Sequence, residues 1–402
     1  MKNKKILINM IFNIIIIYLL GLGFSGKIIK FMFFMSIALN IKLIKQLGLT
    51  DIYLPYLLMN SVSIIFCVLS LNGTSLAAVI SNTSKYLYYL SVFYLYFRIS
   101  RSYEENYLIY IQKILLAISC ISIILLVIYH NPIPININGY QYYTLFKPNF
   151  FARNALTGPF IQPNEFGDLQ IFLIIIALYN LNETKRLSVA SIIVGFLSIF
   201  LSISRTALIL AILVVISYFF INTNFKKKVN LSLIVCFVAI VVGVLNIYNP
   251  DLMRNLMGTK FNQDNLFSGR SQLWEASIQL INEHTLVGVD NDIIRQSYDS
   301  ILDPSLKGLG AHNMYLHLMV TSGIIGITCI FMTILLILLK VKFKQICKRD
   351  LFLITSLFIS VFIRGFTESG LVFVFGVRIF LVWLLFGIFI GKNYRHLNRV
   401  KI

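Results

Sequence analysis

Long apolar blocks alternate with short polar stretches along the whole chain. Each block is roughly 17–22 residues long, the length that a helix needs to cross about 30 Å of hydrocarbon. Helices are the expected spanning form, because each satisfies its own backbone hydrogen bonds where no water is present. The pattern therefore predicts an all-α polytopic membrane protein with about 12 transmembrane helices, near residues 6–23, 28–44, 53–71, 85–99, 107–129, 165–181, 187–203, 206–221, 231–248, 315–338, 350–365 and 373–391.

The basic residues of the short loops fall mostly on one side of this arrangement. They include the N-terminal lysines, residues 226–228, the segment 340–349 and the segment 392–401. Because cytoplasmic loops carry an excess of Lys and Arg, both termini are expected in the cytoplasm. Residues 1–402 then form a single integral membrane domain. Its two long external loops are 130–164 and, between spans 9 and 10, 249–314.

The larger loop contains a helical pattern of its own. Apolar residues from Leu273 and Trp274 to Ile281 recur at helical spacing, after a turn at Ser268-Gly269. A loop of about 65 residues without a role is uncommon.

Composition agrees with a membrane location. Hydrophobic residues make up 58% of the chain and charged residues 13%, which no soluble protein of this length could bury. The net charge of +19 comes mostly from the short loops, so nucleic-acid binding is disfavoured. The five cysteines show no metal-ligand spacing, and four lie inside apolar blocks, which is typical of small buried side chains.

Three polar motifs lie on the predicted external side. Arg205 is in Ser204-Arg205-Thr206, between two apolar blocks, where an arginine either extends to the membrane surface or binds an anion. Arg270 opens the predicted loop helix, where it is a solvated residue or, with the helix dipole, part of an anion site. His312 comes just before the tenth span. It is either an interfacial residue with no chemical role or a general base, since histidine titrates near neutral pH.

The order of these motifs resembles that of the O-antigen ligase and polymerase superfamily. About 65 residues separate Arg205 from Gly269-Arg270-x-x-x-Trp274, and about 42 more lead to His312-Asn313-x-Tyr315-Leu316. Two further passages are similar to family motifs: Thr285-Leu286-Val287-Gly288, and Gly158-Pro159-Phe160 followed by Pro163-Asn164. The motifs cover roughly residues 150–330.

The resemblance implies a GT-C-like glycosyltransferase of the bacterial inner membrane that acts on undecaprenyl-diphosphate-linked glycans outside the membrane, without a metal or cofactor. Arg205 and Arg270 match the arginines thought to hold the diphosphate, and His312 matches the histidine thought to activate the acceptor hydroxyl. Guanidinium groups can stabilise the charge of a diphosphate leaving group, and a base on the opposite side of the anomeric carbon predicts inversion. A chain-length regulator and a flippase of the same pathway are the implied protein partners.

Other charged and polar residues are weaker candidates for substrate binding. Arg364 and Arg378 lie in or beside apolar spans, where they either contact a second diphosphate or, for Arg364, pair with Glu368 four residues on. Arg153 either guides a glycan or is a solvated loop residue, and Asn313 and Tyr315 follow His312 directly.

The spacing Asp290-Asn291-Asp292 formally fits a metal site, but a solvated turn explains it as well. No metal site is therefore expected.

Several functions remain open at this level. A polymerase of O-antigen or capsule repeat units is favoured over a ligase that transfers the glycan to lipid A core, although no residue decides the acceptor. A flippase or transporter also fits twelve spans, but the sequence shows no clear inverted repeat, broken helix or midplane charge. A purely structural membrane protein would leave the order of three motifs unexplained.

Overall fold

The computed structural model describes most of the chain in segments. The described residues are 2–21, 27–46, 76–102, 107–128, 134–137, 140–143, 146–148, 154–160, 162–223, 270–286, 288–289, 294, 296–298, 311–339, 341, 345–368 and 376–393. The predicted spans at 53–71 and 231–248, and the sequence Asp290-Asn291-Asp292, lie outside these residues.

The described chain is mostly helical, as the hydrophobic pattern predicts. Its helices are α1 (Lys2–Gly21), α2 (Lys27–Gln46), α4 (Leu76–Ser102), α5 (Tyr107–Ile128), α6 (Pro163–Tyr179), α7 (Lys185–Leu201), α8 (Arg205–Asn222), α11 (Arg270–Glu283), α13 (Met314–Leu339), α14 (Lys348–Phe358) with its π-helical continuation η5 (Ile359–Ile363), and α15 (Val377–Asn393). The other ten predicted spans each coincide with one of these helices, and the predicted loop helix is α11.

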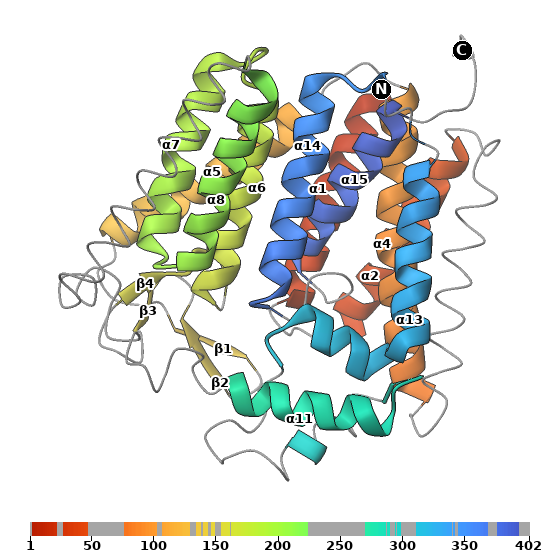
Figure 1. Cartoon of the computed structure of the whole chain (residues 1–402). Helices are drawn as coiled ribbons and strands as arrows, with labels where there is room; N and C mark the ends of the chain where they lie inside the picture. The colour runs from red at the N-terminus through yellow and green to blue at the C-terminus, as the bar shows by residue number, and fades with distance from the viewer. Residues whose placement is uncertain are drawn as a thin grey trace.

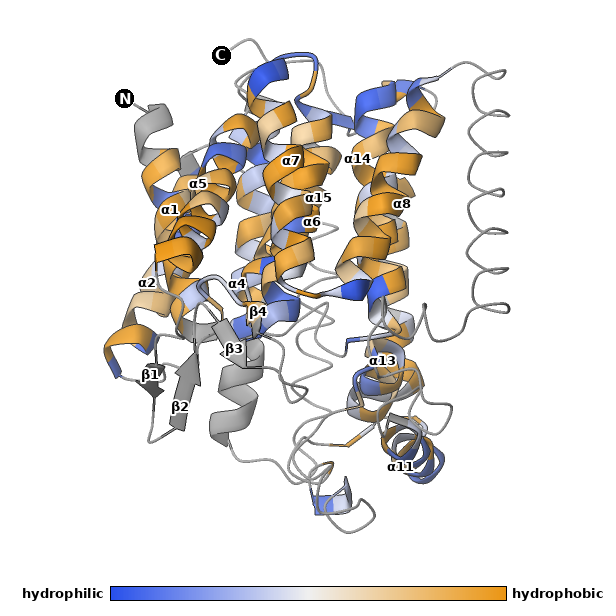
Figure 2. Ribbon diagram, turned by 90° about the vertical axis from the view of Figure 1, so that its left-hand side faces the viewer, coloured by the Kyte–Doolittle hydropathy of each residue, from blue (hydrophilic) through white to orange (hydrophobic). Residues whose placement is uncertain are grey.

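The helices form an elongated bundle. Figure 1 shows α1 beginning and α15 ending at the same end of the bundle, while α11 lies across the opposite end. Apolar residues cover most of the length of the bundle helices, and hydrophilic residues gather at their ends (Figure 2). Among the described helices, α5 and α8 are by themselves long and apolar enough to cross a membrane. The number of spans and the cytoplasmic side remain predictions.

Among the described helices, α4 and α15 pack most closely. Gly387 and Gly391, four residues apart on α15, face the α4 backbone: a Cβ atom would lie 2.5 Å from the Phe93 carbonyl oxygen at Gly387 and 2.4 Å from that of Phe97 at Gly391. Small residues at this spacing let two membrane helices approach backbone to backbone. The contact joins an early and a late part of the chain.

Buried polar side chains connect α1, α2 and α4. Asn9 of α1 donates a hydrogen bond to the Asn40 Oδ1 of α2 at 2.8 Å, and Ser36 donates to Asn13 Oδ1 at 2.7 Å. Asn40 in turn donates to the Ser91 hydroxyl of α4 at 2.9 Å. Such bonds hold helices together in a bilayer, where the apolar surfaces alone provide little driving force for association.

Segment 130–164 contains two short antiparallel strand pairs, which the all-α prediction did not include. They are β1 (Pro134–Ile137) with β2 (Tyr140–Tyr143), and β3 (Phe146–Pro148) with β4 (Asn154–Leu156). In the first pair Ile137 is opposite Tyr140, so only Asn138-Gly139 connects the strands. An Asn-Gly pair between β-branched and aromatic residues is a strong hairpin signal, which was present in the sequence.

Helix α13 is broken, whereas the sequence pattern predicted no broken helix. Gly323 has φ 58° and ψ −170°, and the two halves of α13 run in different directions (Figure 1). Beyond the break, the N–H groups of Ile324 and Ile325 donate to the carbonyl oxygens of Thr285 and Leu286 at 3.0 and 3.2 Å. The Thr-Leu-x-Gly passage therefore supplies hydrogen-bond acceptors that the interrupted helix lacks.

Gly288 is predicted to tolerate no side chain. Its φ is +76°, and a Cβ atom there would lie 2.5 Å from the Ser322 backbone nitrogen. We expect Gly288→Ala to lower the free energy of unfolding by about 1–3 kcal/mol, because both the backbone conformation and the contact would be strained. Thermal unfolding of the purified protein measures this. Gly376→Ala is the matched control, since a Cβ atom there meets nothing within 4 Å, and an equal loss in both variants would contradict the account.

Candidate functional site

His312 lies immediately before α13 in an unusual backbone conformation. Its φ is +46°, in the left-handed region that few non-glycine residues adopt. The next residue, Asn313, caps the helix: its side-chain oxygen accepts hydrogen bonds from the N–H groups of Tyr315 and Leu316 at 2.9 and 3.2 Å. Asn313 thus fixes the turn that presents His312. Its proposed contact with substrate remains a prediction.

A carboxylate lies behind the histidine ring. The Nδ1 atom of His312 is 3.7 Å from Oε2 of Glu368, while the histidine side chain keeps 31% of its surface exposed. The other carboxylate oxygen of Glu368 is 3.5 Å from Nη2 of Arg364 and accepts a hydrogen bond from Asn164 at 3.4 Å. The i, i+4 pairing of Arg364 with Glu368 that the spacing suggested is therefore present.

Two arginines and a buried aspartate support this carboxylate. Arg364 is 1% exposed, and its Nε lies 2.9 Å from Oδ1 of Asp168, which is also 1% exposed. Arg378 pairs with the other oxygen of Asp168. With Glu368, these ion pairs give each buried charge an opposite partner. Glu165, one turn before Asp168 on α6, adds a third carboxylate that interacts with Arg378.

Asp168 was not among the candidates predicted from the sequence, although its position was informative. It lies inside the apolar block of α6, where an ionisable residue is a functional candidate by default. Its partners Arg364 and Arg378 are 196 and 210 residues away in the sequence. The sequence alone did not indicate that these arginines would meet it.

The Ser204-Arg205 motif joins the same set of contacts. The Ser204 hydroxyl donates to the Asn164 side-chain oxygen at 3.2 Å, and Asn164 donates to Glu368. Arg205 is exposed at the first position of α8, just after Ile203, which also has a left-handed φ of 54°. Side-chain contacts therefore connect two of the sequence motifs, Pro163-Asn164 and Ser204-Arg205, to His312.

Helix α11 is tied to the histidine segment by its tryptophan. The indole N–H of Trp274 donates to the carbonyl oxygen of Ala311, the residue before His312, at 2.9 Å. Arg270 is the first residue of α11, as predicted, but its side chain lies outside the described part of the structure, as does Arg153. Tyr315 donates its hydroxyl to the Phe362 carbonyl oxygen at 2.8 Å, so it joins α13 to η5.

The electrostatic surroundings keep Glu368 ionised. Burial alone would raise the pKa of its carboxyl, but the contact with His312 and the guanidinium groups of Arg364 and Arg378 lower it to about 2. Within the described part of the chain, no group of three or more His, Cys, Asp and Glu side chains is placed to hold a metal ion.

A pH-dependent stability difference follows for Glu368→Gln. A carboxyl with a lowered pKa contributes stability that is fully present above its ordinary value of 4.5 and is lost as the pH falls towards about 2. We expect the variant to be about 1–3 kcal/mol less stable near pH 7, and the difference to shrink below about pH 4.5. Thermal unfolding of both proteins across this range measures it. A difference that stays unchanged down to about pH 2 would contradict the pairing.

The fold and site together define a helical membrane protein with a histidine, a carboxylate and arginines at one end of its bundle. A family model described as O-antigen ligase matches residues 190–331, which include Arg205, Arg270 and His312. The match confirms the resemblance to the O-antigen ligase and polymerase superfamily, whose members are glycosyltransferase-like enzymes of the inner membrane that act on lipid-linked glycans. No curated protein and no solved structure shows a significant match.

Proposed function

We propose that the chain is an inverting, metal-independent glycosyltransferase that polymerises undecaprenyl-diphosphate-linked repeat units on the external face of the cytoplasmic membrane. The observation that carries the proposal is the approach of His312 Nδ1 to Glu368, in a site joined to the Ser204-Arg205 motif through Asn164. These groups provide a base, a carboxylate to orient it, and a nearby cation for an anionic leaving group.

The histidine is arranged to act as a general base. A carboxylate at Nδ1 favours the tautomer that carries its proton on that nitrogen, which leaves Nε2 to accept a proton. In the proposed step the acceptor hydroxyl gives its proton to Nε2 of His312 as its oxygen attacks the anomeric carbon. The bond from that carbon to the diphosphate breaks, and the diphosphate leaves with the electron pair. Attack opposite the leaving group inverts the anomeric centre.

The negative charge on the diphosphate requires fixed cations. Arg205, exposed at the start of α8, and Arg270, at the start of α11, take this role in the proposal. Arg364 is buried between Asp168 and Glu368, so we assign it to holding Glu368 rather than to a second diphosphate. Arg378 has 18% of its side chain exposed and stays a candidate for the second substrate.

Polymerase activity is tested with purified protein in lipid nanodiscs, supplied with the lipid-linked repeat unit of its own strain and a metal chelator. A ladder of longer lipid-linked glycans that disappears in Arg205→Ala supports the proposal. Transfer that appears only when lipid A core is added moves the assignment to a ligase. No transfer to either acceptor, with movement of the lipid-linked unit across sealed vesicles, indicates a flippase instead.

A further inference from the structure

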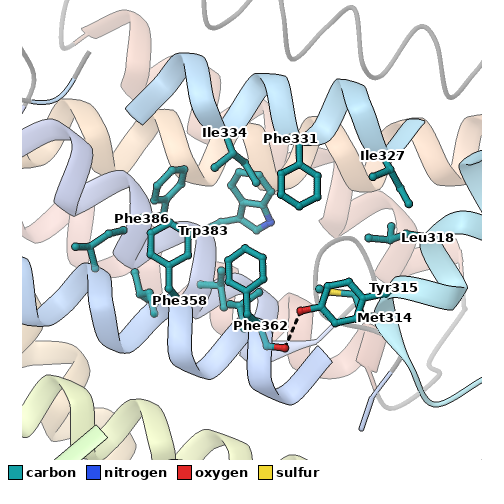
Figure 3. A pocket seen from close by; sticks show the side chains of 14 residues that line it. Met314, Tyr315, Leu318, Ile327, Phe331, Ile334, Phe358, Phe362, Trp383 and Phe386 are labelled. Atoms are coloured by element: carbon teal, nitrogen blue, oxygen red, sulfur yellow. Dashed lines mark hydrogen bonds between the residues drawn. The ribbon is translucent and has the colours of Figure 1, made fainter. Parts of the chain in front are cut away.

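An apolar cavity lies between α13, α15 and the α14–η5 helix, beside the candidate site. It is a half-open hollow with an accessible volume of about 120 Å³ among the described residues. Figure 3 shows Met314 and Tyr315 at one end of the cavity and Phe386 at the other, with Phe331 and Ile334 of α13 along one wall. The cavity is therefore elongated along the bundle helices.

The walls of the cavity suit a hydrocarbon chain. Its surface is entirely apolar, and the one hydroxyl of its lining, that of Tyr315, is bonded to the Phe362 carbonyl oxygen. Ligand sites for polar molecules place a few polar groups in the wall to fix orientation. Here Trp383 contributes an indole to the lining, but no polar surface faces the cavity. The occupant must therefore carry its polar part outside the cavity.

The cavity is continuous with the candidate site at one end. Met314 and Tyr315 follow His312-Asn313 directly, and Phe362 on the opposite wall lies two residues before Arg364. The two walls meet there, since a Cβ atom on Gly365 would lie 3.0 Å from the Met314 side chain. A polar headgroup beside His312 would place an attached chain at this end of the cavity.

Two irregular helices shape the cavity. Both halves of α13 line it, Leu318 before the break at Gly323 and Phe331 after it. The opposite wall includes Phe362 of η5, where a π-helical turn widens the helix. Single π-helical turns occur frequently at functional sites.

We propose that this cavity holds the isoprenoid chain of a lipid-linked diphosphate whose headgroup is bound beside His312. The inference rests on the proposed function, because the substrates of that reaction carry both a diphosphate and an isoprenoid chain. The chain extends from Tyr315 towards Ile334 and Phe386. An acyl chain of an ordinary phospholipid is the competing occupant.

The test uses a sugar-free polyprenyl diphosphate with a photoactivatable diazirine at the end of its chain, added to the full-length protein in nanodiscs. We expect cross-links in the peptides around Ile334 and Phe386, which unlabelled undecaprenyl diphosphate prevents and added phosphatidylglycerol does not. Ile334→Trp fills the inner end and is expected to reduce this labelling about tenfold. Leu335→Trp is the matched control, since Leu335 is the next residue, 48% exposed and not part of the lining.

Other results would overturn the inference. Labelling spread over the exposed apolar faces of α7 and α8, or an equal loss in both tryptophan variants, would show that the cavity is not the chain site. Equal competition by phosphatidylglycerol would assign it to bilayer lipid. Val382→Phe fills the cavity from α15 and is used if Ile334→Trp does not fold.

The probe carries no sugar, so its binding is measured without transfer. A protein that binds the probe here but makes no glycan would contradict the proposed function while leaving the chain site standing. A protein that makes glycan without this labelling would contradict the chain site alone.

Discussion

Replacing His312 with alanine is expected to lower the rate of glycan transfer by about 10²–10⁴-fold, the usual contribution of a general base. The loss should appear in kcat, because the imidazole acts on the acceptor hydroxyl as the new bond forms. Binding of the lipid-linked donor should change little, since the diphosphate is assigned to arginines. Transfer by the purified protein at several donor concentrations separates the two effects.

Two further variants distinguish the chemistry of His312 from its backbone role. His312 has a left-handed φ, and asparagine tolerates this conformation better than most residues. His312→Asn therefore keeps the turn before α13 and removes the base, so it should be as inactive as His312→Ala while unfolding at the temperature of the unmodified protein. His284→Ala, at an exposed position after α11, is the control and should retain full activity. Activity that survives in His312→Asn would exclude the base assignment.

The helices were largely predictable from the sequence because a membrane helix depends on local apolarity and length. The sequence also predicted that a loop helix begins at Arg270, as α11 does, and the spacing of Arg364 and Glu368 suggested their pairing, while the roles of His312, Arg205 and Arg270 stay predictions. Each of these signals lies within a few consecutive residues.

What the sequence did not predict depends on contacts between distant segments. The role of Asp168 depends on its pairing with two arginines about 200 residues away in the sequence. The carboxylate partner of His312 likewise comes from a distant segment, beyond η5. The break in α13 is similar, because the Thr285-Leu286 segment satisfies the backbone groups that the break exposes. Hydropathy contains no information on which polar groups will meet inside a bundle.

Asp168→Asn is expected to lower the free energy of unfolding by about 3–5 kcal/mol, because it removes the charge shared by Arg364 and Arg378. The guanidinium groups of Arg364 and Arg378 would then keep only the carboxylates of Glu368 and Glu165, and Glu368 would be drawn towards them and away from His312. Thermal unfolding and transfer activity should therefore fall together. Asp350→Asn is the control, because Asp350 is also buried but accepts its hydrogen bonds from Tyr179 and Asn393.

We expect the stability of the cluster to depend on the balance between acidic and basic charges rather than on Asp168 alone. Asp168→Asn combined with Arg364→Gln removes one charge of each sign and leaves Arg378 with Glu368 and Glu165. The double variant should therefore be less destabilised than the two single variants predict together, by at least about 1 kcal/mol. Its activity should nevertheless stay low, because Arg364 no longer holds Glu368 behind His312. Strictly additive destabilisation would contradict a charge-balanced cluster, and full activity would show that His312 works without a positioned carboxylate.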